Sequence, residues 1–127
     1  MTKPRFTMVV LLVEDLARSI AFYRRLGVEF PPAAEKRTDV QVPIGDEHQL
    51  VLSTTFGRAI PGYEPPRGDS RAIVEFFVDG TEDVDAKYRE LTEAGYRGRR
   101  EPFVTSFDAY MAMVDDPDGT TVLITAG

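Results

Sequence analysis

The apolar residues at the start of the chain form one continuous run and then one helical stripe. Residues 6–13 are nearly all apolar and do not alternate with polar residues, which is typical of a strand buried on both faces. Asp15 then offers an N-cap, and Gly27 offers a stop. Between them, the apolar positions at helical spacing are Leu16, Ile20 and Tyr23. The pattern predicts a strand followed by a helix.

The same order of features recurs later in the chain at a constant offset. A second apolar run covers residues 72–78. Five positions each lie 68 residues after their counterparts Asp15, Leu16, Ile20, Tyr23 and Gly27; they are Asp83, Val84, Tyr88, Leu91 and Gly95. Chance could match one or two of these positions, but five matches indicate a duplicated unit of strand, helix and stop.

Strand-like segments follow each helix, three in each half. They are Val28–Phe30, Thr38–Val42 and Gln49–Ser53 in the first half, and Tyr96–Arg99, Ala109–Asp115 and Thr120–Thr125 in the second. The sequence therefore predicts an α+β fold of two tandem βαβββ modules, residues 1–54 and 71–127, within one domain, 1–127. The turn at residues 116–119, Asp-Pro-Asp-Gly, joins the last two strands, and we interpret its carboxylates as structural and not as metal ligands.

A segment rich in glycine and proline, residues 55–70, separates the modules. It also carries Phe56, Ile60 and Tyr63, which a solvated tether would not need. Long loops in compact domains often act as lids or binding elements. We therefore interpret this linker as a candidate part of a binding site.

Composition excludes several classes of protein. With 127 residues, 43% of them hydrophobic, the chain fits one domain, and its longest apolar run, Met8–Val13, is too short to span a membrane. We expect a cytoplasmic protein. The absence of cysteine excludes disulfides and thiolate sites, and a formal charge of −6 argues against a nucleic-acid partner. The cluster Arg97, Arg99 and Arg100 could bind an anion, but a solvated turn after a helix is the preferred interpretation.

Short motifs within this tandem pattern resemble the vicinal-oxygen-chelate superfamily, which contains glyoxalases and bleomycin-resistance proteins. They are Val-Glu-Asp-Leu (13–16) and Ala-Phe-Tyr-Arg-Arg-Leu-Gly (21–27), then Glu-Ala-Gly (93–95) and the Asp-Pro-Asp-Gly turn (116–119). The resemblance implies that each module curls its sheet into a half-cup and that two modules form a ligand cavity. It does not imply one function, because the superfamily includes metal-dependent enzymes as well as antibiotic-sequestering proteins.

In the enzymes of this superfamily, metal ligands, usually His and Glu, lie on the first and last strands of each module. The equivalent positions here are Met8, Val51, Ile73 and Leu123, all apolar. An alignment shifted by one residue brings in Thr7, Leu50 or Val122, which give no ligand set either. The single histidine, His48, falls in a polar turn and is expected to be exposed. We therefore expect no metal and no cofactor.

The resemblance instead implies a cup with an apolar and aromatic lining. The predicted ligand-binding residues are Met8, Val51, Phe56, Tyr63, Ile73, Glu75, Phe77, Phe103, Phe107, Tyr110 and Leu123. Phe107 stands where antibiotic-binding relatives commonly carry a tryptophan that stacks on the drug, and Asp108 replaces the glycine that usually follows. For Phe6, Phe22, Phe76 and Tyr88 we expect packing in the core.

Three functions are compatible with these residues. The leading hypothesis is metal-free binding and sequestration of a hydrophobic aromatic molecule, an antibiotic, by a homodimer in which two chains complete each cavity. The second is a metal-free lyase or isomerase that uses Glu75 or Tyr110. The third is an interaction module whose apolar cup faces a protein partner.

Overall fold

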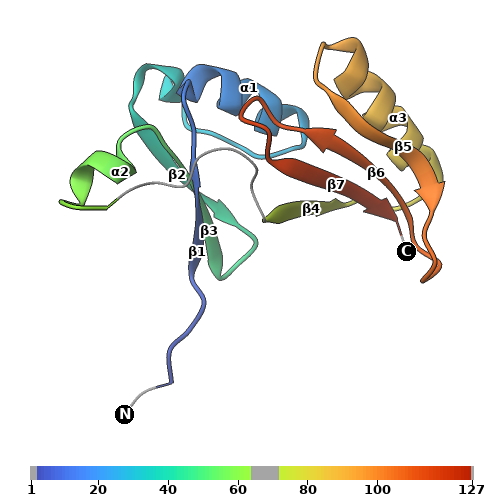
Figure 1. Cartoon of the computed structure of the whole chain (residues 1–127), viewed down its shortest axis with the longest axis horizontal. Helices are drawn as coiled ribbons and strands as arrows, with labels where there is room; N and C mark the ends of the chain where they lie inside the picture. The colour runs from blue at the N-terminus through green and yellow to red at the C-terminus, as the bar shows by residue number, and fades with distance from the viewer. Residues whose placement is uncertain (1–2, 64–71, 127) are drawn as a thin grey trace. The chain divides into compact units, whose positions relative to one another are not determined.

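The computed structural model describes residues 3–63 and 72–126. The chain divides into two compact units, Met1–Pro65 and Pro66–Gly127, and each contains one sheet (Figure 1). Part of the predicted linker, residues 64–70, and the first residue of the second predicted module, 71, lie outside the described residues. Within the described ranges, no helix is long and apolar enough to cross a membrane.

The first unit contains a three-stranded sheet in the order β1-β3-β2. Its elements are β1 (Met8–Leu12), α1 (Leu16–Arg25), the 3₁₀ turn η1 (Ala34–Lys36), β2 (Asp39–Ile44), β3 (His48–Ser53) and the single-turn helix α2 (Phe56–Ala59). Strand β1 pairs with β3 in parallel, and β2 pairs with β3 in antiparallel orientation. The predicted strand–helix start is confirmed.

Helix α1 begins and ends where the sequence predicts. The Asp15 carboxylate accepts a hydrogen bond of 3.1 Å from the Arg18 backbone N–H, which caps the helix. Gly27 has a φ of +90°, a conformation that glycine adopts without steric cost. The predicted stripe, Leu16, Ile20 and Tyr23, is buried.

The predicted strand at residues 28–30 is wrong, because this segment has extended-loop structure and pairs with no strand. The backbone N–H of Val28 donates to the Tyr23 carbonyl at 3.1 Å, so it takes part in the end of α1. Pro31 and Pro32 follow and have no N–H to donate to a ladder. The first unit therefore has the order βαββ.

The second unit has the full βαβββ order, as predicted. Its elements are β4 (Ile73–Phe77), α3 (Thr81–Glu93), β5 (Gly98–Val104), β6 (Tyr110–Asp115) and β7 (Thr121–Ala126). The strand order is β4-β7-β6-β5, with β4 and β7 parallel and the other pairs antiparallel. Helix α3 begins two residues before Asp83, whose carboxylate accepts the Gly80 N–H at 3.2 Å. The residue matched to the Asp15 cap therefore lies inside the first turn of α3.

Helix α3 covers one face of this sheet, packing against β5, β6 and β7 (Figure 1). The buried side chains of the second unit are mainly apolar and include Val84, Leu91, Ala112, Val114, Val122 and Ile124. Residues alternate between the two faces of a strand, so the neighbours of these side chains in sequence point away from α3. We call the side of this sheet opposite α3 the helix-free face.

The aromatic residues assigned to the core differ in their burial. Phe22 is fully buried, and Phe76 and Tyr88 are half-buried. Phe6 is 69% exposed, so its assignment to the core is wrong. The reason is that β1 begins only at Met8, and the Phe6 ring lies in the preceding extended segment, 5.5 Å from the His48 ring.

Candidate functional site

The strand register places three rows of side chains on the helix-free face. Residues directly opposite one another in neighbouring strands point to the same side of a sheet. From β4 to β5, the first row is Phe77, Thr125, Met111 and Phe103, and the second is Glu75, Leu123, Met113 and Arg100. The third row is Ile73, Thr121 and Asp115. Five predicted site residues therefore share this face: Ile73, Glu75, Phe77, Phe103 and Leu123.

The β4 side of the helix-free face is both apolar and accessible. Ile73 is 58% exposed and Phe77 is 65% exposed, and Glu75 lies between them, also exposed. Within the described residues, β4 pairs only with β7, so these side chains stand on an edge strand. Large apolar side chains grouped in this way on a surface are typical of a binding site.

A buried hydroxyl lies in the first row, between Phe77 and Met111. Thr125 is only 5% exposed, and its Oγ1 has no hydrogen-bond partner in the part of the chain that the structure describes. An unsatisfied buried polar atom is unfavourable and uncommon in native proteins. Its position adds a polar group to a row that otherwise consists of aromatic rings and a thioether.

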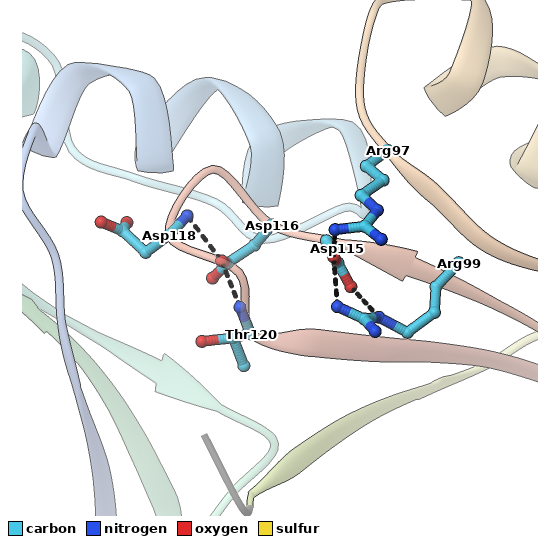
Figure 2. Close-up of polar contacts among 6 residues, drawn as sticks. All are labelled: Arg97, Arg99, Asp115, Asp116, Asp118 and Thr120. Atoms are coloured by element: carbon cyan, nitrogen blue, oxygen red, sulfur yellow. Dashed lines mark hydrogen bonds and ion pairs between the residues drawn. The ribbon is translucent and has the colours of Figure 1, made fainter. Parts of the chain in front are cut away.

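The arginine cluster is exposed, as the sequence suggested, but two of its members are directed at a buried carboxylate. The Arg99 guanidinium donates two hydrogen bonds, of 2.7 and 2.8 Å, to the two carboxylate oxygens of Asp115, whose side chain is buried (Figure 2). Arg97 approaches the same carboxylate at 3.9 Å. This arrangement joins β5 to β6, and a forked pair of this kind fixes the geometry of both partners.

Arg100 has a different environment from Arg97 and Arg99. It lies opposite Met113 on the helix-free face, and its guanidinium carbon lies 4.1 Å from the centroid of the Phe103 ring. A guanidinium over an aromatic face is a favourable cation–π contact. The contact orients Arg100 and Phe103 together at the β5 side of the face.

The turn between β6 and β7 confirms the structural interpretation of Asp116. Its Oδ1 accepts backbone N–H bonds from Asp118 and Thr120, both 2.9 Å long (Figure 2). The carboxylate therefore satisfies donors within its own turn. Gly119 completes the turn with a φ of +89°.

Phe107 lies in the loop between β5 and β6 and is 72% exposed. The loop is closed by a bond of 2.8 Å from the Thr105 N–H to the Ala109 carbonyl. Asp108 has a φ of +73°, in the left-handed region that favours glycine, the residue that the resemblance implies at this position. Aspartate is one of the residues that tolerate this region, so the replacement keeps the same turn.

Tyr110 does not share the helix-free face. Its hydroxyl donates a hydrogen bond of 2.6 Å to the Asp85 carboxylate on α3, on the opposite side of the sheet. This bond to Asp85, together with desolvation and the negative charge of Asp85, raises the pKa of Tyr110 above its usual value. Glu75 and Tyr110 therefore lie on opposite faces, and the structure does not bring the two candidate catalytic groups together.

In the first unit, Met8 and Val51 share one face of the sheet, with Gln49 directly opposite Met8. Phe56 and Tyr63 are exposed, and their rings meet edge to face at a centroid distance of 6.4 Å. All four are predicted site residues, and they belong to the unit at residues 1–65. Phe107 and Tyr110 complete the predicted set.

Polar contacts hold the segment that carries Phe56 against the sheet. The Phe56 N–H donates to Ser53 Oγ at 2.9 Å, and the Thr55 hydroxyl contacts both carboxylate oxygens of Asp39 at 2.9 and 2.7 Å. Burial alone would raise the pKa of Asp39, but hydrogen bonds from Thr55, Ser53 and Thr54 outweigh it and lower the pKa. The ionised Asp39 therefore helps to position Phe56.

The side chains at the superfamily's metal positions do not fit a divalent cation. Met8, Val51, Ile73 and Leu123 offer no oxygen or nitrogen ligand, and a thioether is a poor ligand for a hard metal ion. Among residues 3–63 and 72–126, no group of three or more His, Asp or Glu side chains could hold a metal. The expectation that no metal is bound stays a prediction for direct analysis.

Sequence reasoning missed six residues of the helix-free face. They are Arg100, Met111, Met113, Asp115, Thr121 and Thr125. Strand alternation could have found all of them except Arg100, because they lie at even spacing on the last two strands, β6 and β7. Arg100 could not be placed, because the register between β5 and β6 shifts on both sides of it.

Comparisons with known proteins agree on the fold. The sequence model of the Glyoxalase/Bleomycin resistance protein/Dioxygenase superfamily matches residues 5–124, and a search of curated proteins found no match. A hypothetical protein from S. aureus superposes with a TM-score of 0.77 at 23% identity, covering 100% of this chain and 95% of that one. A glyoxalase-related enzyme from Fulvimarina pelagi superposes with a TM-score of 0.81 at 18% identity, covering 97% of this chain and 88% of that one. A lactoylglutathione lyase from Agrobacterium tumefaciens superposes with a TM-score of 0.69 at 20% identity, covering 100% of this chain and 96% of that one.

Proposed function

The chain belongs to the Glyoxalase/Bleomycin resistance protein/Dioxygenase superfamily, and from this premise we propose that it binds and sequesters a hydrophobic aromatic molecule, an antibiotic, without a metal. The observation that carries the proposal is the helix-free face, where Ile73 and Phe77 are 58% and 65% exposed. Ligand sites are mostly apolar, with a few polar groups that orient the ligand. Glu75 and Arg100 are exposed polar groups of this kind on the same face.

Aromatic side chains near this face suit a planar ligand. Phe77 and Phe103 lie at the two ends of the first row, and Phe107 follows in the loop after β5. Each offset stack contributes about 0.5–1.5 kcal/mol beyond the burial of apolar area. Two stacks, together with apolar contacts to Leu123 and Met113, support micromolar or tighter binding.

Binding without chemistry is favoured over the lyase or isomerase alternative by the isolation of Glu75. Catalytic carboxylates are usually tuned by burial and by neighbouring groups, whereas Glu75 is exposed. Glu75 has no hydrogen bond or ion pair to any described residue, and its neighbours across the sheet and along β4 are Leu123, Ile73 and Phe77. Tyr110, the other candidate, is bonded to Asp85 on the opposite face.

A homodimer is part of the proposal. The second unit exposes Ile73 and Phe77 on the helix-free face and Phe107 in the loop after β5, and exposed apolar side chains grouped on a surface are typical of contact with a partner or a ligand. A second copy on the helix-free face would remove part of this surface from water and enclose the ligand between two chains. Sedimentation at micromolar concentration should show a dimer, and a monomer at that concentration would contradict this part of the proposal.

A thermal-shift screen of planar aromatic antibiotics tests the proposed function. A ligand at 100 times its Kd stabilises the native state by about 2.7 kcal/mol, which raises Tm by several degrees. The variant Phe77→Ser should lose most of this shift. Phe6→Ser is the matched control, because Phe6 is equally exposed but lies in the first unit, outside the helix-free face.

The outcomes separate the alternatives. Stabilisation of the wild type and of Phe6→Ser, with recovery of the unchanged compound by mass spectrometry, supports binding without chemistry. Conversion of the compound during incubation supports the lyase or isomerase instead. Equal stabilisation of Phe77→Ser and Phe6→Ser would contradict the placement of the site on the helix-free face.

A further inference from the structure

Opposite charges occupy the two ends of the middle row of the helix-free face. Glu75 stands on β4 and Arg100 on β5, at the two edges of the sheet. Leu123 and Met113 separate them on the two central strands. A surface that is apolar in the centre and charged at both ends matches a ligand with the same layout.

The strand spacing sets the size of that ligand. Glu75 and Arg100 are three strand spacings apart, which corresponds to about 14 Å between their backbones. Both side chains are long, so groups that contact them can lie a few ångströms closer together than the backbones. Two joined aromatic rings with a substituent at each end span roughly this distance.

Neither charge is neutralised by a neighbour within the described residues. Glu75 makes no ion pair there, and Arg100 contacts the uncharged ring of Phe103. The other two arginines of this segment differ, because Arg99 and Arg97 are directed at the buried Asp115. Both Glu75 and Arg100 are exposed. Each is therefore available to a charged group of a ligand.

We propose that the ligand of the helix-free face is zwitterionic, an elongated aromatic molecule with a basic group against Glu75 and an acidic group against Arg100. The aromatic core lies over Leu123 and Met113, flanked by the rings of Phe77 and Phe103. This inference rests on the proposed function and adds the charge layout of the ligand to it. It also gives Arg100 a role in ligand recognition, since Arg100 forms no ion pair with a described residue that would explain its place in the fold.

Four biphenyl probes test the charge layout by calorimetry. One carries an aminomethyl group and a carboxylate at opposite ends, two carry only one of these groups, and the fourth carries neutral hydroxymethyl and carboxamide groups. The zwitterion should bind tightest. Glu75→Gln should weaken the zwitterion and the amine but not the acid, and Arg100→Gln should weaken the zwitterion and the acid but not the amine.

Each loss should be roughly two- to fivefold in Kd, the range expected for one exposed charge pair, and should shrink at high salt. Glu101→Gln is the control, because it removes an exposed charge from β5 next to Arg100 without changing either end of the row. Its affinities should match those of the wild type.

The proposal and its premise fail in different ways. If the neutral probe binds as tightly as the zwitterion, and neither variant changes any Kd, the charge layout is overturned while the proposed function stands. If Glu101→Gln changes the affinities as much as Arg100→Gln, the general charge of the surface and not the row is responsible, which also overturns the inference. If none of the four probes binds, the proposed function is contradicted as well.

Discussion

Truncation of Phe107 tests whether this side chain lines the ligand site or packs in the core. The side chain is 72% exposed, so less than a third of its surface is removed from water by folding. The accessible area of a phenylalanine side chain is about 200 Å², and at about 25 cal/mol/Å² burial of the remaining part contributes roughly 1.4 kcal/mol as an upper estimate, part of which the alanine Cβ retains. Phe107→Ala should therefore lower the free energy of unfolding by about 1 kcal/mol or less.

Phe22→Ala is the matched comparison, because Phe22 is a fully buried residue of α1 beside Tyr23. Its truncation should cost about 3–5 kcal/mol. For a chain of this length, about 3–5 °C of Tm corresponds to each kcal/mol, so Phe107→Ala should melt within a few degrees of the wild type. Phe22→Ala should melt more than about 10 °C lower.

Ligand affinity completes the comparison. Phe107→Ala should weaken the ligand by about 1–3 kcal/mol, or roughly five- to more than a hundredfold in Kd, because one stack and its contact area are lost. Phe107→Trp should retain or improve the affinity. The reasoning is refuted if Phe107→Ala melts like Phe22→Ala while its folded fraction binds the ligand normally.

Three further predictions concern packing, pH and metal. Gly98→Ala should lower the free energy of unfolding by about 1–3 kcal/mol, because a Cβ there would lie 2.9 Å from Tyr88 Cζ and 3.0 Å from Thr92 Cγ2. In denaturant titration, adding Tyr88→Ala to this variant should remove most of the cost of the Gly98 substitution. A cost that persists in the double variant would contradict the clash. The raised pKa of Tyr110 means that its neutral form stabilises the fold below about pH 10, the usual pKa, and that this contribution is lost as pH rises through the folded-state pKa. The Tm difference between wild type and Tyr110→Phe should therefore narrow above about pH 10, and a constant difference up to pH 11.5 would argue against the role of Asp85. Elemental analysis should find no stoichiometric transition metal, and about one zinc, manganese or iron per chain would overturn the interpretation of Met8, Val51, Ile73 and Leu123.

The duplicated strand–helix unit could be predicted from the sequence because local chemistry determines it. The Asp15 cap, the α1 stripe and the stops at Gly27 and Gly95 depend on residues a few positions apart. The strand at residues 28–30 could not be rejected from its apolar residues alone, because the competing hydrogen bond from Val28 to Tyr23 is visible only in the structure. Two prolines immediately after it were the available warning.

The β4 side of the helix-free face was predictable from the sequence, and the β5 side was not. Ile73, Glu75 and Phe77 follow from strand alternation in a single segment. The forked pair between Arg99 and Asp115 joins residues 16 positions apart across a ladder with register shifts. No local pattern specifies that contact. The face on which Tyr110 lies could not be predicted for a similar reason, since it depends on where β6 begins relative to the loop after Phe107.

Methionine methyl NMR can detect an aromatic ligand on the helix-free face at a single side chain. The chain has four methionines, of which Met113 lies in the middle row between Leu123 and Arg100. With ¹³C-methyl methionine, titration of the aromatic compound that gives the largest thermal shift should move the Met113 methyl signal upfield to saturation. Phe77→Ser should require more of the compound to reach the same shift. A Met113 signal that stays in place at saturating compound would contradict the account.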